Sequence, residues 1–332
     1  MENKNILSVS SIRPIDFSDL ATQQSWSRML SHGKRKNLEL ILQVRTLVTE
    51  SIFSSLRKRG FVHPPVHIFS TCVDPLNHET EPAGFNYYGQ ECTLMQSLIF
   101  HKMVFLSMSG IKKVFWVSPN IRKEMHITNL TRYATEFSQI DFESSTYQMD
   151  ETMDLIEDVT KEMLEKLSSE FGEEIKKLCG RDPGSLITKF PRIDVMEEAR
   201  SSGVDPDDVE KILATKLQTP FFLTNMKREA YDYKDTDSGK YHNYDLVFPV
   251  TGEVLSGGER EHSYDKLKQR MEELDYPLDY FAPVLKFAKE VGFGTSSGAG
   301  FGVERMVRGI LLLNDIAEVY AFRRVPGEKI IF

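Results

Sequence analysis

Hydrophobic residues recur at helical spacing in two long stretches of the chain. Because an α-helix turns every 3.6 residues, such a stripe lies on one face and predicts an amphipathic helix. The first stretch begins at Lys36 and ends at Gly60, and the second spans residues 150–179. The two stripes consist of Leu40, Ile41, Val44, Leu47, Val48, Ile52 and Leu56, and of Leu155, Ile156, Val159, Met163, Leu167, Phe171, Ile175 and Leu178.

Shorter apolar and alternating segments predict strands. They are "KKVFWVSPNIRKE", "TEFSQIDFESS", "TPFFLTNM" and "YHNYDLVFPVTGEVLSGGERE", while "CTLMQSLIFHKMVFLSMSG" reads as a short strand that runs into a helix. In "FVHPPVHIFS" each proline disfavours helix at the preceding residue, which predicts extended chain. Residues 180–219 carry glycine, proline and charge clusters with a short helix near 206–216, so we interpret 150–219 as a helical insertion between strands.

This order of elements indicates the fold class. Strands, a helical insertion and further strands are typical of an α+β fold with one central, mostly antiparallel sheet. Residues 1–35 are polar and aperiodic, and we expect them to form an N-terminal arm. Residues 36–332 would then form one domain, although a length of 332 residues also allows two.

Composition excludes several classes of protein. The chain is 40% hydrophobic with a formal net charge of −8, which disfavours an extended nucleic-acid footprint but allows a local basic pocket. Cys72, Cys92 and Cys179 are scattered without metal-ligand spacing, as expected in a reducing compartment. The N-terminus has no apolar signal core, and no apolar run reaches membrane-spanning length. We therefore expect a cytoplasmic protein with no membrane partner.

The segment "NIRKEMHITNLTRYATEFSQIDFE" concentrates side chains suited to a nucleotide. Arg122 and Glu124 alternate along a strand, Arg132 lies on the connecting loop, and Phe137 and Asp141 lie on the returning strand. They offer guanidinium groups for phosphate, an aromatic face for a purine and carboxylates for donors. A solvated hairpin with ordinary charges would show the same pattern, so these residues alone leave both interpretations open.

Two further segments carry candidate ligands. Asp245 and Glu253 lie at neighbouring strand positions and could hold Mg²⁺, which prefers a few carboxylates with phosphate oxygens. Gly258 would let a ligand approach the backbone, and Arg260 follows it. The alternative is a glycine-rich bulge with surface charges. Lys102, within an apolar helix start, either extends to solvent or faces a pocket.

The stretch "SSGAGFGVERMVRGILLL" places three glycines before a helix that carries Arg305. Glycine-rich turns that open onto helices often bind phosphate, but two common motifs do not match. A dinucleotide fingerprint should follow a strand with different glycine spacing, and a phosphate-binding loop of the Walker type needs Gly-Lys-Ser/Thr where this chain has GVER.

Three segments together resemble the class II aminoacyl-tRNA synthetase core. "GFVHPPVHIFS" looks like its first motif, "IRKEMHITNLTRYATEFSQIDFE" like its second, and "GAGFGVERMVRGI" like its third. "EFSQIDFE" and "GEVLSGGEREHSYD" follow the aspartyl/asparaginyl branch. "DPLNHE", "SGGERE", "GAGFGVERMVR" and "RVPG" are most similar to the archaeal-type asparagine synthetases, which are synthetase cores without a tRNA-binding domain. The resemblance covers about residues 36–332.

The resemblance implies a homodimer built on a six- or seven-stranded antiparallel sheet flanked by helices. It also implies ATP and Mg²⁺ as cofactors. Arg122 would bind the α-phosphate and Arg305 the far phosphate, and both would be catalytic. The remaining ATP contacts would be Glu124 at the adenine amino group, Arg132 at outer phosphates, Phe137 stacked on adenine opposite Arg305, Gly302 in the turn, and Glu253 with Asp245 around the metal.

The resemblance also implies a pocket for an amino acid. Lys102 and Arg260 would grip the carboxylate that is not activated, and Asp141, helped by Glu81, would bind the ammonium group. Gln96 and Gly258 complete the expected substrate contacts. The aspartyl enzymes show a Gln-Ser-Pro-Gln run where this chain has "QSLI", so Ile99 replaces a glutamine that contacts the ammonium side.

The implied reaction is amide ligation. ATP would adenylate the β-carboxylate of L-aspartate, and ammonia would then give asparagine, AMP and pyrophosphate. No glutaminase segment is expected, so free ammonia or another amine would be the acceptor.

Three alternatives stay open. The first is the same chemistry on another acid or amine in a specialised pathway. The second is aminoacylation of tRNA, disfavoured because only residues 1–35 precede the first helix and the net charge is −8. The third is a catalytically silent regulatory paralogue, against which stands the presence of Arg122, Glu124, Asp245, Glu253 and Arg305.

Overall fold

The computed structural model describes residues 15–76, 78–125 and 131–332. Residues 1–14 of the expected arm, Asn77 of "DPLNHE", and residues 126–130 of the loop before Arg132 lie outside this description. In chain order the elements are α1 (Leu20–Gly33), α2 (Leu38–Lys58), β1 (Phe69–Ser70), β2 (Thr80–Glu81), β3 (Gly84–Tyr87), β4 (Gln90–Leu94), α3 (Ile99–Ser109), β5 (Lys113–Ile121), β6 (Lys123–Glu124), β7 (Glu136–Ser144), α4 (Met149–Cys179), η2 (Pro183–Leu186), β8 (Arg192–Asp194), α5 (Val195–Ser202), α6 (Pro206–Lys216), β9 (Phe221–Thr224), β10 (Asn243–Phe248), β11 (Gly252–Glu259), α7 (Tyr264–Glu273), α8 (Ala282–Glu290), β12 (Ser297–Gly302), α9 (Val303–Leu311) and η3 (Ile316–Val319).

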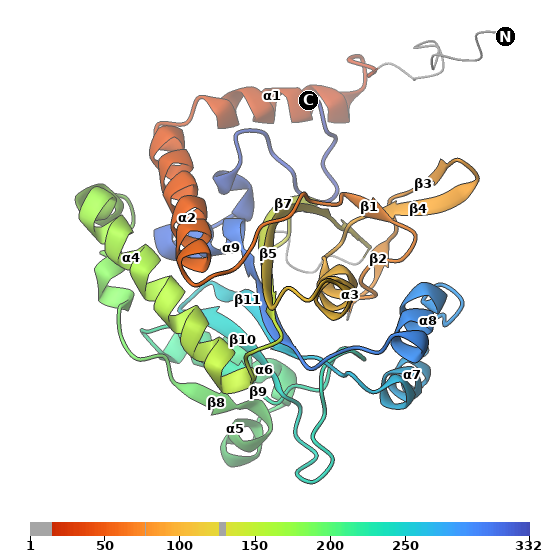
Figure 1. The fold of residues 1–332 in the computed structure, drawn as a ribbon. Coiled ribbons are helices and arrows are strands. Elements are labelled where there is room, and N and C mark those ends of the chain that lie inside the picture. Colours follow the sequence, from red (N-terminus) through yellow and green to blue (C-terminus); the bar gives the residue numbers. More distant parts are fainter. Residues whose placement is uncertain (1–14, 77, 126–130) are drawn as a thin grey trace, which may run out of the picture.

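A seven-stranded sheet forms the centre of the molecule (Figure 1). Its strand order is β5-β7-β12-β11-β10-β9-β8. Every neighbouring pair is antiparallel except β8 and β9, which run parallel. The predicted α+β class with a mostly antiparallel sheet is therefore confirmed. The parallel pair comes from the insertion, where a strand of three residues is too short to show a periodic pattern.

Helices α2, α4 and α9 cover one face of the sheet, and α3, α7 and α8 lie on the other side (Figure 1). The predicted stripe of α2 packs into the core through Val44, Val48, Ile52 and Leu56, all fully buried. Each such side chain contributes about 1.5–3 kcal/mol through its burial. Because these helices bury one face of the sheet in the hydrophobic core, the opposite face can carry polar side chains.

Two parts of the chain differ from the sequence-based expectation. Residues 20–33, expected to be aperiodic, form α1, which Asp19 caps by accepting from the Thr22 amide at 2.9 Å. Contacts distant in sequence hold α1 in place, among them His32 Nε2 to the Tyr320 carbonyl at 2.8 Å. In the insertion, α4 and α6 are confirmed, whereas α5 and β8 were not predicted. The assignment of residues 1–35 as an arm and 36–332 as one domain stays a prediction.

In the described part of the chain, no helix is both long enough and apolar enough to cross a membrane.

Candidate active site

A cavity of about 570 Å³ lies on the sheet face opposite α2 and α4. The alternation of β7 explains its polar floor. Phe137, Gln139 and Asp141 line the cavity, while Ile140 and Phe142 between them point into the core. Further lining comes from α3, β10, β11, β12, the start of α9 and the loop between β9 and β10. The cavity thus gathers side chains from segments far apart in sequence.

One half of the cavity is rich in arginine. Arg305 Nη1 lies 2.9 Å from one oxygen of Glu253, and Arg132 Nη2 lies 3.3 Å from the other. Burial alone would raise the pKa of Glu253, but Arg305 and Arg132 outweigh burial and lower this pKa to about 2. Glu253 therefore stays ionised and holds two guanidinium groups at the cavity wall, where they can meet anionic oxygens.

Arg122 and Phe137 stack on each other in the same half. The Arg122 guanidinium carbon lies 5.0 Å from the centre of the Phe137 ring. Its Nε and Nη2 both donate to the Gln96 carbonyl at 3.1 Å. Glu124 lines the same half and pairs with His78 Nε2 at 3.0 Å. The predicted nucleotide contacts Arg122, Glu124, Arg132, Phe137, Glu253, Gly302 and Arg305 all line this cavity.

The insertion also reaches the arginine-rich half. Glu210, on α6, pairs with Arg132 Nη2 at 3.0 Å. It also accepts a hydrogen bond from the Glu253 amide at 2.9 Å. Asp207 of the same helix lines the cavity. Because α6 belongs to 150–219, the insertion positions site residues, a role that its sequence pattern did not indicate.

The other half of the cavity holds two buried cations. Lys102 is 2% exposed, and its Nζ lies 3.0 Å from Asp141 Oδ1 and 3.5 Å from Glu143 Oε2. The interpretation of Lys102 as extending to solvent is therefore wrong, and the pocket-facing one is confirmed. Arg260 lies beside it, and Glu143 outweighs the effect of burial and raises the pKa of Arg260. Asp141 Oδ2 accepts no hydrogen bond from the described residues and is buried, so one acceptor stays available in this half.

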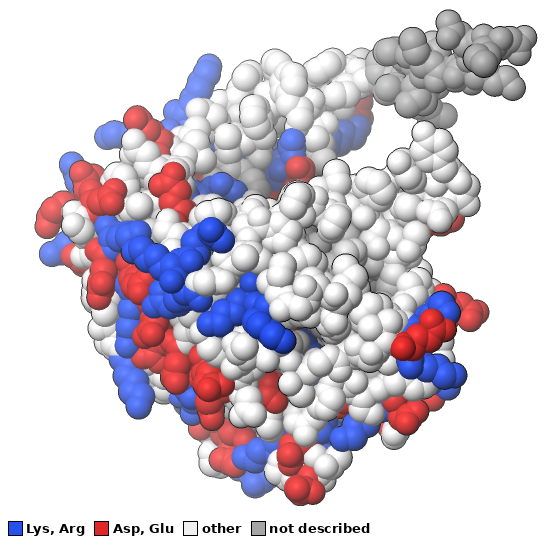
Figure 2. All heavy atoms as spheres, in the orientation of Figure 1, with Lys and Arg blue, Asp and Glu red and all other residues white. Residues whose placement is uncertain are grey.

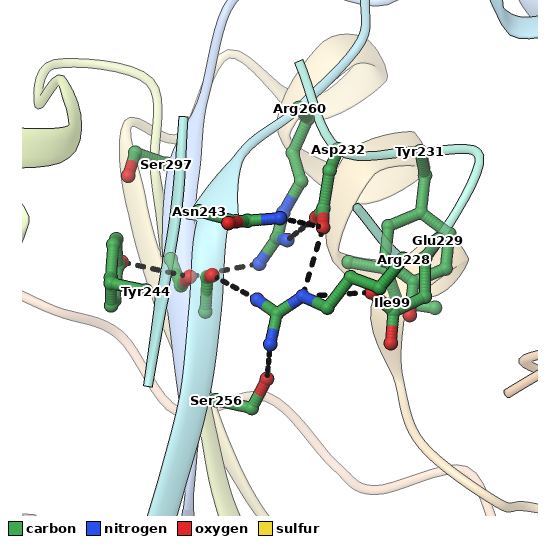
Figure 3. A network of polar contacts seen from close by, with 12 residues as sticks. Ile99, Arg228, Glu229, Tyr231, Asp232, Asn243, Tyr244, Ser256, Arg260 and Ser297 are labelled. Atoms are coloured by element: carbon green, nitrogen blue, oxygen red, sulfur yellow. Dashed lines mark hydrogen bonds and ion pairs between the residues drawn. The ribbon is translucent and has the colours of Figure 1, made fainter. Parts of the chain in front are cut away.

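Arg228 is the centre of a network that the sequence analysis missed (Figure 3). It donates to Asp245 Oδ1 at 2.6 Å, to Ser256 Oγ at 2.8 Å and to the Gly257 carbonyl at 2.7 Å. Its Nε lies 3.1 Å from Asp232 Oδ2. Burial would lower the pKa of Arg228, but the surrounding carboxylates raise it well above its usual value. The only sequence signal was a charged cluster, "KREAYD", in a loop without periodicity.

Three expected substrate contacts do not line the cavity. Glu81 pairs with Lys123 at 2.7 Å, and its side chain is 56% exposed. The Gln96 side chain donates to Thr80 Oγ1 at 2.7 Å, and only its carbonyl faces Arg122. Gly258 packs against β10, where an added Cβ would lie 2.9 Å from the His242 carbonyl. The pair with Lys123, the hydrogen bond to Thr80 and the packing against β10 therefore hold these three residues away from the cavity wall.

The glycines of β12 permit close packing within the sheet. A Cβ at Gly298 would lie 2.1 Å from the Phe142 carbonyl, and one at Gly300 would lie 2.1 Å from the Gln139 side-chain nitrogen. A side chain at either position would displace the polar groups of β7. The expected turn into a helix is present, because β12 ends at Gly302 and α9 begins at Val303. The first two glycines therefore make room for Gln139, Asp141 and Glu143.

Asp245 and Glu253 lie on neighbouring strands but are not directly opposed. Asp245 is in register with Ser256, and Glu253 is in register with Val247. Burial raises the pKa of Asp245 to about 6 even though Arg228 opposes it, and repulsion by Glu253 adds to the rise. A divalent cation would relieve this repulsion, and two carboxylates with substrate phosphates suit Mg²⁺. The donor types therefore fit Mg²⁺, but Asp245 Oδ1 and both Glu253 oxygens are paired with arginines in this structure, and no cluster of three metal-ligating side chains occurs among the described residues.

Comparison with known proteins gives a consistent result. The family model "tRNA synthetases class II (D, K and N)" matches residues 22–326. The aspartate–tRNA(Asp/Asn) ligase of Methanopyrus kandleri is 27% identical over 304 residues, covering 88% of this chain and 69% of the relative. The asparagine–tRNA ligase of Mycoplasma genitalium is 25% identical over 342 residues, covering 89% and 71%. The structure of asparaginyl-tRNA synthetase from Pyrococcus horikoshii with asparaginyl-adenylate superposes with a TM-score of 0.80 at 23% identity, covering 94% of this chain and 74% of that one.

Proposed function

The chain belongs to the class II tRNA synthetases (D, K and N), in the aspartyl/asparaginyl branch, and on this premise we propose that it is an AMP-forming amide ligase. It would adenylate the β-carboxylate of L-aspartate and transfer the acyl group to ammonia, giving asparagine, AMP and pyrophosphate. The observation that carries the proposal is one cavity that joins an arginine-rich half to a half with two buried cations.

The arginine-rich half suits adenylation. Arg122 would stabilise charge at the α-phosphate as the carboxylate attacks, and Arg305 would hold the far phosphate. A carboxylate is already a nucleophile, so this step needs positioned positive charge and no base. Asp245 and Glu253 would hold Mg²⁺, which supplies charge neutralisation at the phosphates when bound. Phe137 and Glu124 would receive adenine, with Arg132 at the outer phosphates.

The half that carries Lys102 and Arg260 suits a dicarboxylic amino acid. These two cations would bind the carboxylate that is not activated, and Asp141 Oδ2 would accept from the substrate ammonium group. Ile99 lines this cavity at the position where the aspartyl enzymes carry a glutamine. An apolar side chain there cannot contact an ammonium group, which favours an aspartate turned to present its β-carboxylate to ATP.

Aminoacylation of tRNA is the second candidate, because the matched relatives include aspartate–tRNA and asparagine–tRNA ligases. Transfer to tRNA benefits from an extended basic surface. The chain instead has a formal net charge of −8. On the face seen in Figure 2, one group of basic side chains at centre left adjoins acidic side chains, and a wide uncharged area lies beside it. These features support a small acceptor over tRNA. The remaining alternatives are the same chemistry on a different acid or amine, and a catalytically silent paralogue.

A product assay tests the proposal. The enzyme is incubated with Mg-ATP, L-aspartate and ammonium chloride, with and without tRNA, and the products are read by mass spectrometry and nucleotide chromatography. Asparagine with AMP in the absence of tRNA is the expected result. Aspartyl-tRNA without asparagine would favour the second candidate, and no nucleotide turnover would favour a silent paralogue. A homodimer, implied by the family resemblance, and a cytoplasmic location, expected from the composition, stay predictions.

A further inference from the structure

Most carboxylates of the cavity are engaged by fixed donors. Asp74 is held by three of them: the Leu76 amide at 3.0 Å, Ser97 Oγ at 2.6 Å and the Tyr231 hydroxyl at 3.2 Å. Asp245 is held by Arg228, and Glu253 by Arg305 and Arg132. The oxygens of these carboxylates are therefore already engaged before any ligand binds.

Glu229 differs from these carboxylates. It lines the cavity from the loop between β9 and β10, and its side chain is 12% exposed. Its Oε2 accepts no hydrogen bond within the described chain. The cation beside it is Arg228, whose Nε lies 2.9 Å from Oε2 but also 3.1 Å from Asp232 Oδ2. Glu229 therefore lines the cavity wall while its Oε2, buried beside Arg228, keeps unused acceptor capacity.

Arg228 fixes the position of Glu229. Its guanidinium is bound to Asp245, Ser256 and the Gly257 carbonyl, so its own position is set by β10 and β11. Figure 3 shows Arg228 between the strand that carries Ser256 and the group formed by Ile99, Glu229 and Tyr231. A carboxylate held in place yet short of hydrogen bonds can receive a donor from a ligand without prior rearrangement.

The surroundings of Glu229 favour its protonated form. Burial raises the pKa of Glu229 to about 8, Arg228 opposes the rise, and Asp232 and Asp74 add to it. Glu229 in turn contributes to the raised pKa of two neighbouring phenols, Tyr231 and Tyr276, for which burial is the main cause. A general base works best with a pKa near the working pH.

The amide-forming step needs such a group. Ammonia exists mainly as ammonium at neutral pH, and ammonium has no lone pair with which to attack an acyl-adenylate. We infer that Glu229 is the proton acceptor that converts bound ammonium into the attacking ammonia in the second half-reaction. This inference rests on the proposed function. It identifies the residue that would let the enzyme use an amine that binds as a cation.

The step balances as follows. One N–H bond of ammonium breaks, and its proton goes to the Glu229 carboxylate. The nitrogen lone pair forms a C–N bond to the β-carbonyl carbon of the adenylate. The C–O bond to AMP then breaks, and its electron pair leaves on the phosphate oxygen. The surplus proton on nitrogen passes to solvent, and Glu229 returns its own proton to water.

The test separates the two half-reactions of a Glu229→Gln variant. Adenylation is followed as aspartate-dependent exchange of pyrophosphate into ATP, and amide formation as asparagine from ammonium chloride. We expect exchange to persist while amide formation falls about 100-fold or more, the usual contribution of a general base. Hydroxylamine, largely unprotonated at neutral pH, should restore most of the rate as the hydroxamate. Glu290→Gln, on the exposed end of α8, is the matched control.

Each other outcome has a definite meaning. Unchanged ammonia-dependent synthesis in Glu229→Gln overturns the inference, as does equal loss with ammonia and hydroxylamine. Glu229→Asp keeps the carboxylate, and loss of exchange in both variants would place Glu229 in adenylation and also overturn it. Absence of aspartate-dependent exchange in the unmodified enzyme would instead count against the proposed function itself.

Discussion

Arg260, which lines the cavity, faces the fully buried Glu143 through two parallel contacts. Arg260 Nε lies 3.0 Å from Glu143 Oε1, and Nη2 lies 3.1 Å from Oε2. The two side chains are 4% and 0% exposed. Bidentate pairing of this kind fixes both orientation and charge. Arg260 is therefore a preset cation, held by its partner before any acid arrives.

Breaking this pair should destabilise the fold. Arg260→Met leaves Glu143 buried without its main partner, and we expect a loss of about 3–5 kcal/mol in the free energy of unfolding. The double variant Arg260→Met/Glu143→Met removes both charges, and its loss should be smaller than the sum of the two single losses by about 1–3 kcal/mol. Urea unfolding of the three variants measures this, and strict additivity would show that the pair is not coupled.

Arg122→Ala should strongly reduce adenylate formation while the fold is kept. The guanidinium contacts the Gln96 carbonyl and the Phe137 ring but pairs with no described carboxylate in the salt-bridge geometry. Its loss should lower aspartate-dependent pyrophosphate exchange by about 100- to 1,000-fold, as removal of a charge-stabilising donor does. Arg192→Ala, at an exposed pair with Asp150, is the control. A near-normal exchange rate for Arg122→Ala would contradict the assignment.

Glu210→Gln tests whether the insertion supports the proposed ATP binding in the arginine-rich half. The change weakens the pair with Arg132 and keeps a possible acceptor for the Glu253 amide. We expect KM for ATP to rise about 3- to 10-fold, because a partly buried charged contact contributes on the order of 1 kcal/mol. KM for aspartate should stay constant. Steady-state exchange kinetics measures both, and an equal rise in the two values would indicate a general loss of structure.

Glu229 should make stability fall as the pH rises. Its folded-state pKa of about 8 lies above the ordinary glutamate value of 4.5, so between these pH values the folded state binds a proton that the unfolded state has lost. The free energy of unfolding therefore decreases with pH across this window and levels off above it. Glu229→Gln should flatten the decrease. Urea unfolding at intervals from pH 5 to pH 9 measures the free energy of unfolding of both proteins. Parallel pH dependences for the unmodified protein and Glu229→Gln would contradict the shifted pKa.

Much of the fold followed from local pattern. The stripes of α2 and α4 predicted their buried faces, because burial on one side imposes the period of the element. Phe137 and Asp141 were predicted on one strand, and the alternation of β7 brings both to the cavity. Helix α1 was not predicted, because it is held by contacts between residues far apart in sequence, such as His32 and Tyr320. No local pattern reports such a contact.

Candidate site residues could be predicted from the sequence where they lie on strands or at helix starts. Those that lie on the loop between β9 and β10 could not. Lys102 is on a helix and Arg260 directly follows a strand, and both line the cavity. Arg228 and Glu229 come from an aperiodic loop, and only the tertiary fold brings them beside Asp245. Glu81 was predicted in the site but lies outside the cavity, because it forms an ion pair with Lys123.

Which carboxylate reaches the α-phosphate is the central question, and isotope transfer answers it directly. L-Aspartate labelled with ¹⁸O in its side-chain carboxylate is incubated with the enzyme, Mg-ATP and ammonium chloride, and AMP and asparagine are analysed by mass spectrometry. Attack by the β-carboxylate places one labelled oxygen in AMP and leaves one in the asparagine amide. Unlabelled AMP, with both labelled oxygens kept in the amino acid, would contradict β-adenylation.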